Sequence, residues 1–191
     1  MTLEDPCLAA PDRAAAQSLI DDTRSGLASV GLLGDKTDAE LRAAGYFWIN
    51  DRIGGFRHYV NWSYTNLFIG VGTVEMDPNA IESLVVREVG GGRLRVVAAM
   101  YVLNAGRTMS SVPYIAGELT TWHDHTNLCW GIGEWGTPVV VGLTRAPGDC
   151  GGRGFYSRTP PMLHVWMDMT GNACGPFAGV DEGGVMCEHD H

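Results

Sequence analysis

The chain of 191 residues has almost no lysine and no cluster of basic residues. Lys36 is the only lysine, arginine supplies the remaining positive charge, and the net charge at pH 7 is −9. Nucleic-acid phosphates and anionic membrane surfaces both attract proteins through concentrated positive charge. The composition therefore argues against nucleic acid and against a charged membrane surface as partners.

Long apolar segments are missing as well. No run approaches the roughly 18 residues that a membrane-spanning helix needs, so we expect no membrane span. The opening sequence MTLEDPCLAAPDR has neither the basic start nor the apolar centre of a signal peptide. We therefore expect no signal peptide in this chain, although a protein from which a signal peptide has been removed would look the same.

Several common catalytic motifs are also absent. The chain has no G-x-S-x-G nucleophile elbow, no P-loop and no glycine-rich dinucleotide motif that opens a helix. No two of its cysteines form a C-x-x-C pair. The five cysteines are scattered near turns, which is typical of disulfide partners in an oxidising compartment. They are Cys7, Cys129, Cys150, Cys174 and Cys187. We expect an exported protein, periplasmic or extracellular, with at least one cysteine that is free, bound to metal or bridged between chains.

The first 45 residues have a helical pattern. Apolar residues recur near one face of residues 12–30, and Asp12 can cap the start of that helix. The sequence from Thr37 to Glu40 is a capping box, which predicts a second, short helix that ends at Gly45. We expect residues 1–45 to form a segment of two short helices packed against a larger body.

From residue 46 the pattern changes to short runs rich in β-branched and aromatic residues, bounded by Gly, Pro, Asn or Asp. Two runs surround the glycines 90–92, which is typical of a hairpin. The expected strands are 46–50, 57–62, 66–72, 83–89, 93–103, 117–125, 128–133, 138–143 and 162–169. Without interleaved helices they predict an all-β antiparallel barrel or jelly roll over residues 46–180, followed by a polar tail at 181–191.

Two of the six histidines lie close together in the sequence TWHDHTNLC, residues 121–129. In a strand, residues i and i+2 project from the same face, so His123 and His125 could bind one ion together. A third histidine, His164, lies in a long apolar run and should be buried. A metal ion is one of the few partners that satisfy a buried neutral imidazole. We predict that these three histidines form one metal site.

The spacing around the first two histidines resembles the first motif of the cupin superfamily. That motif reads G, five residues, H-x-H, three or four residues, E, six residues, G. Here Gly117, His123, His125, Cys129 and Gly136 occupy these places, with cysteine where cupins have glutamate. The resemblance implies a cupin-like barrel with a metal ion on its histidines.

The second cupin motif is present in degraded form. Gly154, Pro160, His164 and Asp168 occupy the corresponding places, but the spacing is one residue short and the inner glycine is Met162. The chain also resembles a group of bacterial cupin-like proteins that are often exported. The shared blocks are H-Y-x-N, W-H-x-H-x-N-L-C, M-x-H-V-W and C-G-P-F-A. The resemblance implies His164 as the third metal ligand.

By this resemblance the protein would bind one divalent transition metal, Fe, Zn or Cu. Three neutral ligands leave coordination positions for O2 and a substrate, which implies a non-haem Fe(II)-type oxygenase acting on a small molecule. The alternative is a non-catalytic exported protein that binds copper or zinc. Cupins often form dimers, so a homodimer is a further expectation.

Two more residues are candidates for the metal site. Cys129 could form a disulfide, remain a free thiol beside the metal as in cupin thiol dioxygenases, or bind the metal directly. His58 alternates with Val60 and Trp62 in an aromatic run and could enter the same cavity as a ligand or a hydrogen-bonded neighbour.

Other residues have roles that stay open. The tail residues Cys187, His189 and His191 could bind metal or simply be solvated. An arginine such as Arg57 or Arg153 could hold an anionic group of a substrate. Trp122 or Trp130, Trp166 and Met162 are expected to form apolar walls around the metal.

Overall fold

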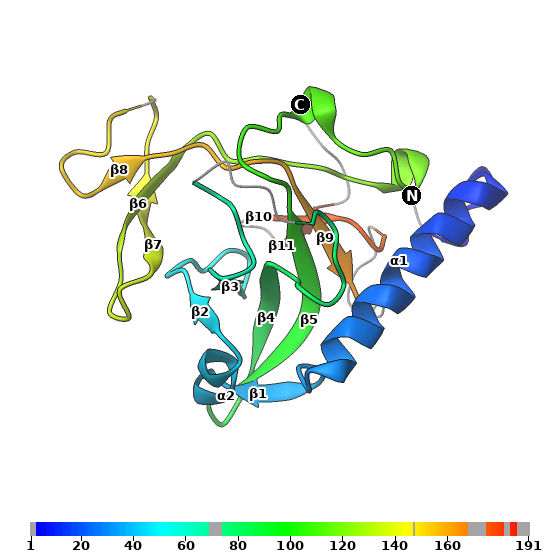
Figure 1. Ribbon diagram of the computed structural model, residues 1–191, viewed down its shortest axis with the longest axis horizontal. Coiled ribbons are helices and arrows are strands. Elements are labelled where there is room, and N and C mark those ends of the chain that lie inside the picture. The colour runs from blue at the N-terminus through cyan, green and yellow to red at the C-terminus, as the bar shows by residue number, and fades with distance from the viewer. Residues whose placement is uncertain (1–2, 69–73, 147, 168–174, 182–183, 187–191) are drawn as a thin grey trace.

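The computed structural model describes the chain except for residues 1–2, 69–73, 147, 168–174, 182–183 and 187–191. The described part consists mainly of antiparallel β-sheets, with two α-helices near the N-terminus (Figure 1). The predicted β-rich class is therefore confirmed. Within the described part the strands do not close into a barrel, so the cupin-like jelly roll stays a prediction.

Two helices form the N-terminal segment. Helix α1 spans Ala10–Ser29 and is longer than predicted, and α2 spans Asp38–Ala43. The capping box is confirmed, because Glu40 N donates to the Thr37 hydroxyl and Thr37 N donates to the Glu40 carboxylate. Asp12 does not cap α1: the helix begins one turn earlier and Ala9 is its N-cap. Among the described residues, no helix is both long and apolar enough to cross a membrane.

The larger sheet is built on a hairpin of two long strands. It contains β1 Asp35–Thr37, β2 Tyr46–Trp48, β3 Phe56–Asn61, β4 Ser83–Gly90, β5 Arg93–Val102 and β9 Met162–Trp166. The strand order is β1-β5-β4-β3-β2, and β9 pairs with the second half of β5. The predicted hairpin at residues 90–92 is confirmed, since all three glycines there have positive φ, the conformation that a tight β-turn needs.

Both faces of the larger sheet are buried. One face packs against α1, where the Thr23 and Tyr101 hydroxyls are 2.9 Å apart and Arg24 donates to the Met167 carbonyl. The other face carries Met162 and Trp166 in a second apolar cluster. Residues 162–167 thus alternate between the two faces, and this second face holds the candidate site.

A smaller sheet lies at the end of the molecule opposite α1 (Figure 1). It contains β6 Leu128–Ile132, β7 Pro138–Leu143 and β8 Phe155–Tyr156, in the order β7-β6-β8. A separate hairpin pairs β10 Gly179–Asp181 with β11 Gly184–Met186, so regular structure extends into the predicted polar tail.

The expected strand over residues 117–125 is wrong. The expected strand over residues 66–72 is not formed in the part of it that the structure describes. Residues 117–125 contain the 3-10 helix η2, Gly117–Leu119, and then a single bridge between His123 and Met162. Gly117 has φ +57, which ends an extended run, and a side chain there would lie 2.6 Å from an Asp12 oxygen. Residues 66–68 are not in a strand, and 69–72 lie outside the described residues. A second 3-10 helix, η1, spans Met109–Ser111.

Candidate functional site

The curvature of the larger sheet brings two of its histidines together. His58 lies on β3 and His164 on β9, three strand spacings apart, which would be about 14 Å in a flat sheet. Yet the two Nε2 atoms are 3.3 Å apart. The sheet therefore curls enough for side chains from these distant strands to meet over one face. His58, a weaker candidate from sequence, thus belongs to the same cluster as His164.

The other two histidines are held against β9 and the segment before it. His123 N donates to the Met162 carbonyl, and Met162 N donates back at 2.7 Å. His125 N donates to the Thr159 hydroxyl at 2.8 Å, while Thr159 N donates to the His125 carbonyl. These hydrogen bonds, and not the predicted strand, position the rings of His123 and His125.

The four rings form a continuous chain of contacts. Ring centroids are 5.6 Å apart for His58 and His164, 4.8 Å for His164 and His123, and 5.6 Å for His123 and His125. The structure therefore gathers all three histidines predicted as ligands, together with His58.

A buried carboxylate that sequence reasoning missed fixes the orientation of His58. Asp51 lies between β2 and β3, and its Oδ2 is 2.5 Å from His58 Nδ1, while its Oδ1 accepts from His58 N at 2.9 Å. Burial raises the pKa of Asp51, but attraction to His58 and the hydrogen bonds from it lower that pKa further, so the net pKa is below its usual value. An ionised Asp51 accepts a hydrogen bond from His58 Nδ1, and this orientation of the ring directs Nε2 at His164.

Two histidines of the cluster, His125 and His164, have lowered pKa values that favour the neutral form. The His164 side chain is 1% exposed, and burial, with the neighbouring histidines second, puts its pKa well below the usual value. Burial and then the charge of His58 lower the pKa of His125. Neutral imidazoles are the form that binds metal ions. In addition, His164 Nδ1 is buried and has no hydrogen-bond partner within the described part.

The spacing of the rings fits a shared metal ion only in part. Two nitrogens bound to one tetrahedral zinc ion lie about 3.3 Å apart, which matches the separation of His58 Nε2 and His164 Nε2. The centroid separations bracket the roughly 5 Å expected for two imidazoles on one ion. However, among the described residues no three His, Cys, Asp or Glu side chains have donor atoms already arranged to hold an ion. An ion at this position would need at least one ring to turn.

A cavity of about 460 Å³ lies beside the cluster, between the two sheets. His58 and His125 belong to its wall, whereas His164 and His123 do not line it. Two of the predicted apolar wall residues, Trp130 and Met162, line it. The apolar lining residues are Ile49, Ile53, Val60, Leu67, Met100, Val102, Leu128, Trp130, Val140, Leu143 and Met162; the polar ones are Asp51, Arg52, His58, His125, Asn127 and Thr159. The volume lies within the range of small-molecule sites.

The other residues predicted around the site lie elsewhere. Trp166 packs beside His164 and Phe56, outside the cavity wall, and Trp122 belongs to the cluster under α1. Arg57 is bound to Glu88 at 3.0 Å and does not line the cavity. The positive residue of the wall is Arg52, which no local sequence signal distinguishes.

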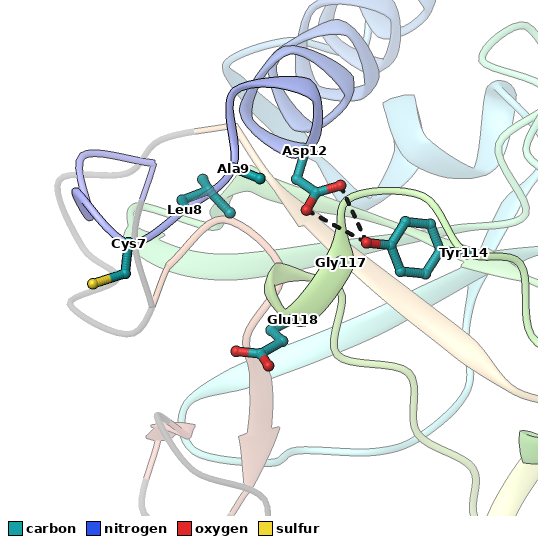
Figure 2. Close-up of a pocket in the computed structure, with 7 residues that line it drawn as sticks. All are labelled: Cys7, Leu8, Ala9, Asp12, Tyr114, Gly117 and Glu118. Atoms are coloured by element: carbon teal, nitrogen blue, oxygen red, sulfur yellow. Dashed lines mark hydrogen bonds between the residues drawn. The ribbon is translucent and has the colours of Figure 1, made fainter.

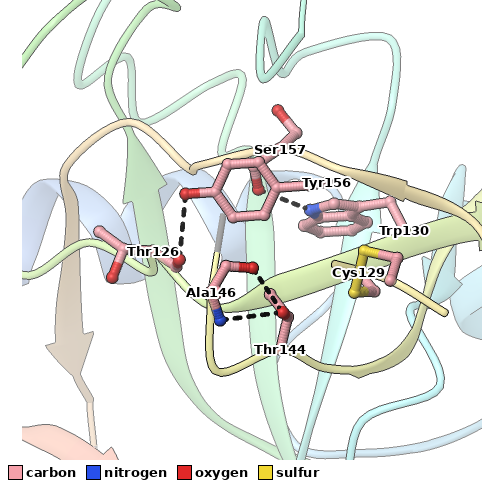
Figure 3. Close-up of a disulfide and its surroundings, with 8 residues drawn as sticks. Thr126, Cys129, Trp130, Thr144, Ala146, Tyr156 and Ser157 are labelled. Atoms are coloured by element: carbon pink, nitrogen blue, oxygen red, sulfur yellow. Dashed lines mark hydrogen bonds between the residues drawn. A yellow bond between two sulfur atoms is a disulfide. The ribbon is translucent and has the colours of Figure 1, made fainter. Parts of the chain in front are cut away.

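Cys129 forms a disulfide with Cys150 (Figure 3). Its neighbours Leu128 and Trp130 line the cavity, so the alternation of β6 turns Cys129 toward the opposite face, beside a separate hollow that also contains Arg153. Of the alternatives left open by the sequence, the disulfide is therefore correct. Cys129 is neither a metal ligand nor a free thiol beside the histidines.

The disulfide is expected to contribute about 3 kcal/mol to the free energy of unfolding, because it closes a loop of 21 residues. The double variant Cys129→Ala/Cys150→Ala should lose about this amount in urea denaturation. Cys7 is free and exposed, so Cys7→Ser serves as the control and should leave the unfolding curve unchanged. Equal stability of the double variant and the wild type would contradict the assigned bridge.

A second hollow, of about 590 Å³, lies at the start of α1 (Figure 2). In it the Tyr114 hydroxyl donates to the Asp12 carboxylate at 3.3 Å, and Glu118 and Cys7 line the same wall. None of the described residues that line this hollow is a histidine, and none of them lines the cavity beside the cluster. The predicted site residues Asp168, Cys187, His189 and His191 lie outside the described residues.

Compared with known proteins, the chain matches no family model, no curated protein and no solved structure.

Proposed function

We propose that this protein binds one transition-metal ion at the cluster of His58, His123, His125 and His164 and acts on a small molecule in the adjacent cavity. The observation that carries the proposal is the convergence of four imidazoles from β3, β9 and residues 123–125 at one end of an apolar cavity. Within the described part of the chain Asp51, on His58, is the acidic partner of the four histidines. A group of imidazole ligands is typical of a site for Zn, Cu or Fe.

The environment of the rings supports this proposal. Burial of His164 and His125 favours neutral imidazoles, which are ready to bind a metal without first losing a proton. Asp51 holds His58 in the way that carboxylates commonly orient metal-bound histidines. The unpartnered Nδ1 of His164 shows a buried polar group whose hydrogen-bonding capacity is not used by the protein.

The reaction class that the cupin resemblance favours is metal-dependent oxygenation. A ferrous ion held by three histidines supplies O2 activation when it is bound. The chain itself would contribute a wall that excludes water, formed by residues such as Trp130 and Met162, and a wall histidine, His125, at the open side of the cluster.

A second candidate function rests on His58. If all four histidines bind one ion, a tetrahedral shell is complete and no position stays open for a substrate. That arrangement suits a non-catalytic zinc- or copper-binding protein. The disulfide Cys129–Cys150 is compatible with an exported protein, where such a metal-binding role would operate.

Metal analysis of untagged protein tests the proposal. After loading with Zn²⁺, Cu²⁺ or Fe²⁺ and removal of excess ion, we expect one equivalent of metal per chain. A content near zero for all three ions would exclude the metal site. The visible spectrum of the Co²⁺-loaded protein then separates the two candidates. A four-coordinate spectrum that added azide leaves unchanged supports a closed storage site, and a spectrum that azide changes supports an open, catalytic one.

A further inference from the structure

The wall of the cavity beside the histidines is mostly apolar and contains few charged side chains. Of the seventeen described residues that line the cavity, eleven are apolar, and Asp51 and Arg52 are the charged ones. The Asp51 carboxylate is already used, because both of its oxygens accept hydrogen bonds from His58. The positive charge that the wall offers to a ligand is therefore the guanidinium of Arg52.

Arg52 is only loosely held by the protein. Its Nη2 is 3.7 Å from a Glu88 oxygen, and the side chains of Arg52 and Glu88 are 62% and 53% exposed. The same Glu88 oxygen is bound more closely by Arg57, at 3.0 Å. An exposed pair at this distance contributes little, so the guanidinium can exchange it for a ligand at small cost.

We propose that the cavity binds an amphipathic small molecule that has one carboxylate, with the carboxylate on Arg52 and an apolar body along Val60, Met100 and Met162. A guanidinium pairs with a carboxylate through two parallel hydrogen bonds. The single positive charge of the Arg52 guanidinium matches the single negative charge of a carboxylate, whereas a phosphate dianion carries one negative charge more. As a statement about the substrate this rests on the proposed function, but the binding itself needs no metal.

The exposure of Arg52 places the carboxylate at the mouth of the cavity. The deeper wall is formed by aliphatic residues and Trp130, so the apolar carbons of the ligand extend inward and pass the rings of His58 and His125. The geometry thus assigns the carboxylate a role in anchoring the ligand, and it brings carbon atoms rather than the charged group to the histidines.

Binding of octanoate and of octan-1-ol to metal-free protein tests the inference, with the fluorescence of Trp130 and the other tryptophans as readout and calorimetry as a second measurement. We expect wild type to bind octanoate at least 10-fold more tightly than octan-1-ol. In Arg52→Gln the affinity for octanoate should fall at least 10-fold, while the affinity for octan-1-ol stays within two-fold. Equal binding of the two probes by wild type, no binding of either, or unchanged octanoate binding by Arg52→Gln would overturn the inference.

Arg57→Gln is the matched control. Arg57 shares the contact with Glu88 but lies over the Trp48 ring, outside the cavity, so its removal should change octanoate affinity by less than two-fold. A loss as large as that of Arg52→Gln would show that general surface charge attracts the probe, and would also overturn the inference. Octanoate binding by a protein that binds no metal would refute the proposed function alone, and metal binding without octanoate binding would refute the carboxylate ligand alone.

Discussion

Replacing His164 with alanine is expected to weaken Zn²⁺ binding by at least about 100-fold. The His164 ring is the centre of the cluster, since it lies 3.3 Å from the His58 nitrogen and stacks on His123. Loss of a direct ligand should exceed the roughly 10- to 100-fold loss that follows removal of a group that only orients a ligand. Competition with a chromophoric chelator measures the affinity of both proteins.

Two variants show whether the loss comes from ligation. Asp51→Asn leaves every proposed ligand in place but weakens the hold on His58, so it should cost about 10- to 100-fold. The double variant His189→Ala/His191→Ala should bind Zn²⁺ like wild type. A large loss in the double variant, with His164→Ala unaffected, would move the metal site to the tail and refute the cluster.

The effect of His164→Ala on folding must be separated from its effect on Zn²⁺ binding, because His164 is 1% exposed and removal of its side chain leaves a cavity. The increase in melting temperature on adding Zn²⁺ provides this separation, since a ligand stabilises a folded protein according to its affinity. Wild type is expected to gain several degrees, and His164→Ala should gain almost nothing even if its metal-free form melts lower. An equal gain in both proteins would contradict the proposed role of His164.

Features that depend on neighbouring residues were predictable from the sequence. The capping box at Thr37 and Glu40 and the glycine turn at residues 90–92 each have a local physical cause, and the structure confirms both. The strand over residues 117–125 was not predictable in this way. Its β-branched and aromatic residues suggested a strand. Its hydrogen-bond partners, however, come from residues 159–162, which provide a single bridge and a threonine hydroxyl instead of a ladder.

The candidate site was predictable in its histidines and not in their surroundings. The grouping of His123, His125 and His164 follows from residue type and spacing. By contrast, the position of His58 depends on how strongly the sheet curls between β3 and β9, a property of the whole sheet. Cys129 follows His123 by six residues, which would put both side chains on one face of a continuous strand, but the backbone at 124–127 is irregular. Asp51 and Arg52 enter through a connection between strands, which no periodicity describes.

A buried carboxyl group away from the cavity should dominate the pH dependence of the free energy of unfolding above pH 7. Glu82 lies just before β4, is 1% exposed and accepts one long hydrogen bond, at 3.4 Å from Val102 N. Burial raises its pKa from 4.5 to about 8, and the negative charges of Asp77 and Glu75 add to that rise. A shift of this size corresponds to roughly 5 kcal/mol against the ionised form in the folded chain.

The sign of the pH effect follows from the direction of the shift. Between pH 4.5 and about 8 the folded chain keeps a proton on Glu82 that the unfolded chain releases. The stability supplied by the protonated form is therefore complete below pH 4.5 and is lost as the pH rises through 8. Below pH 7 the buried His125 and His164 act in the opposite direction, because their lowered pKa values make the unfolded chain bind more protons. The effect of Glu82 is thus isolated between pH 7 and 9.

In that interval the wild-type free energy of unfolding should fall by about 1.4 kcal/mol, since the folded chain loses most of one proton that the unfolded chain has already released. Glu82→Gln keeps an acceptor for Val102 N and cannot ionise, so its urea-unfolding free energy should stay constant between pH 7 and 9. Glu40→Gln removes an exposed carboxylate whose pKa is lowered by hydrogen bonds from Thr37, and it should keep the wild-type slope. Parallel slopes for wild type and Glu82→Gln would show that Glu82 is ionised in the folded protein throughout this range.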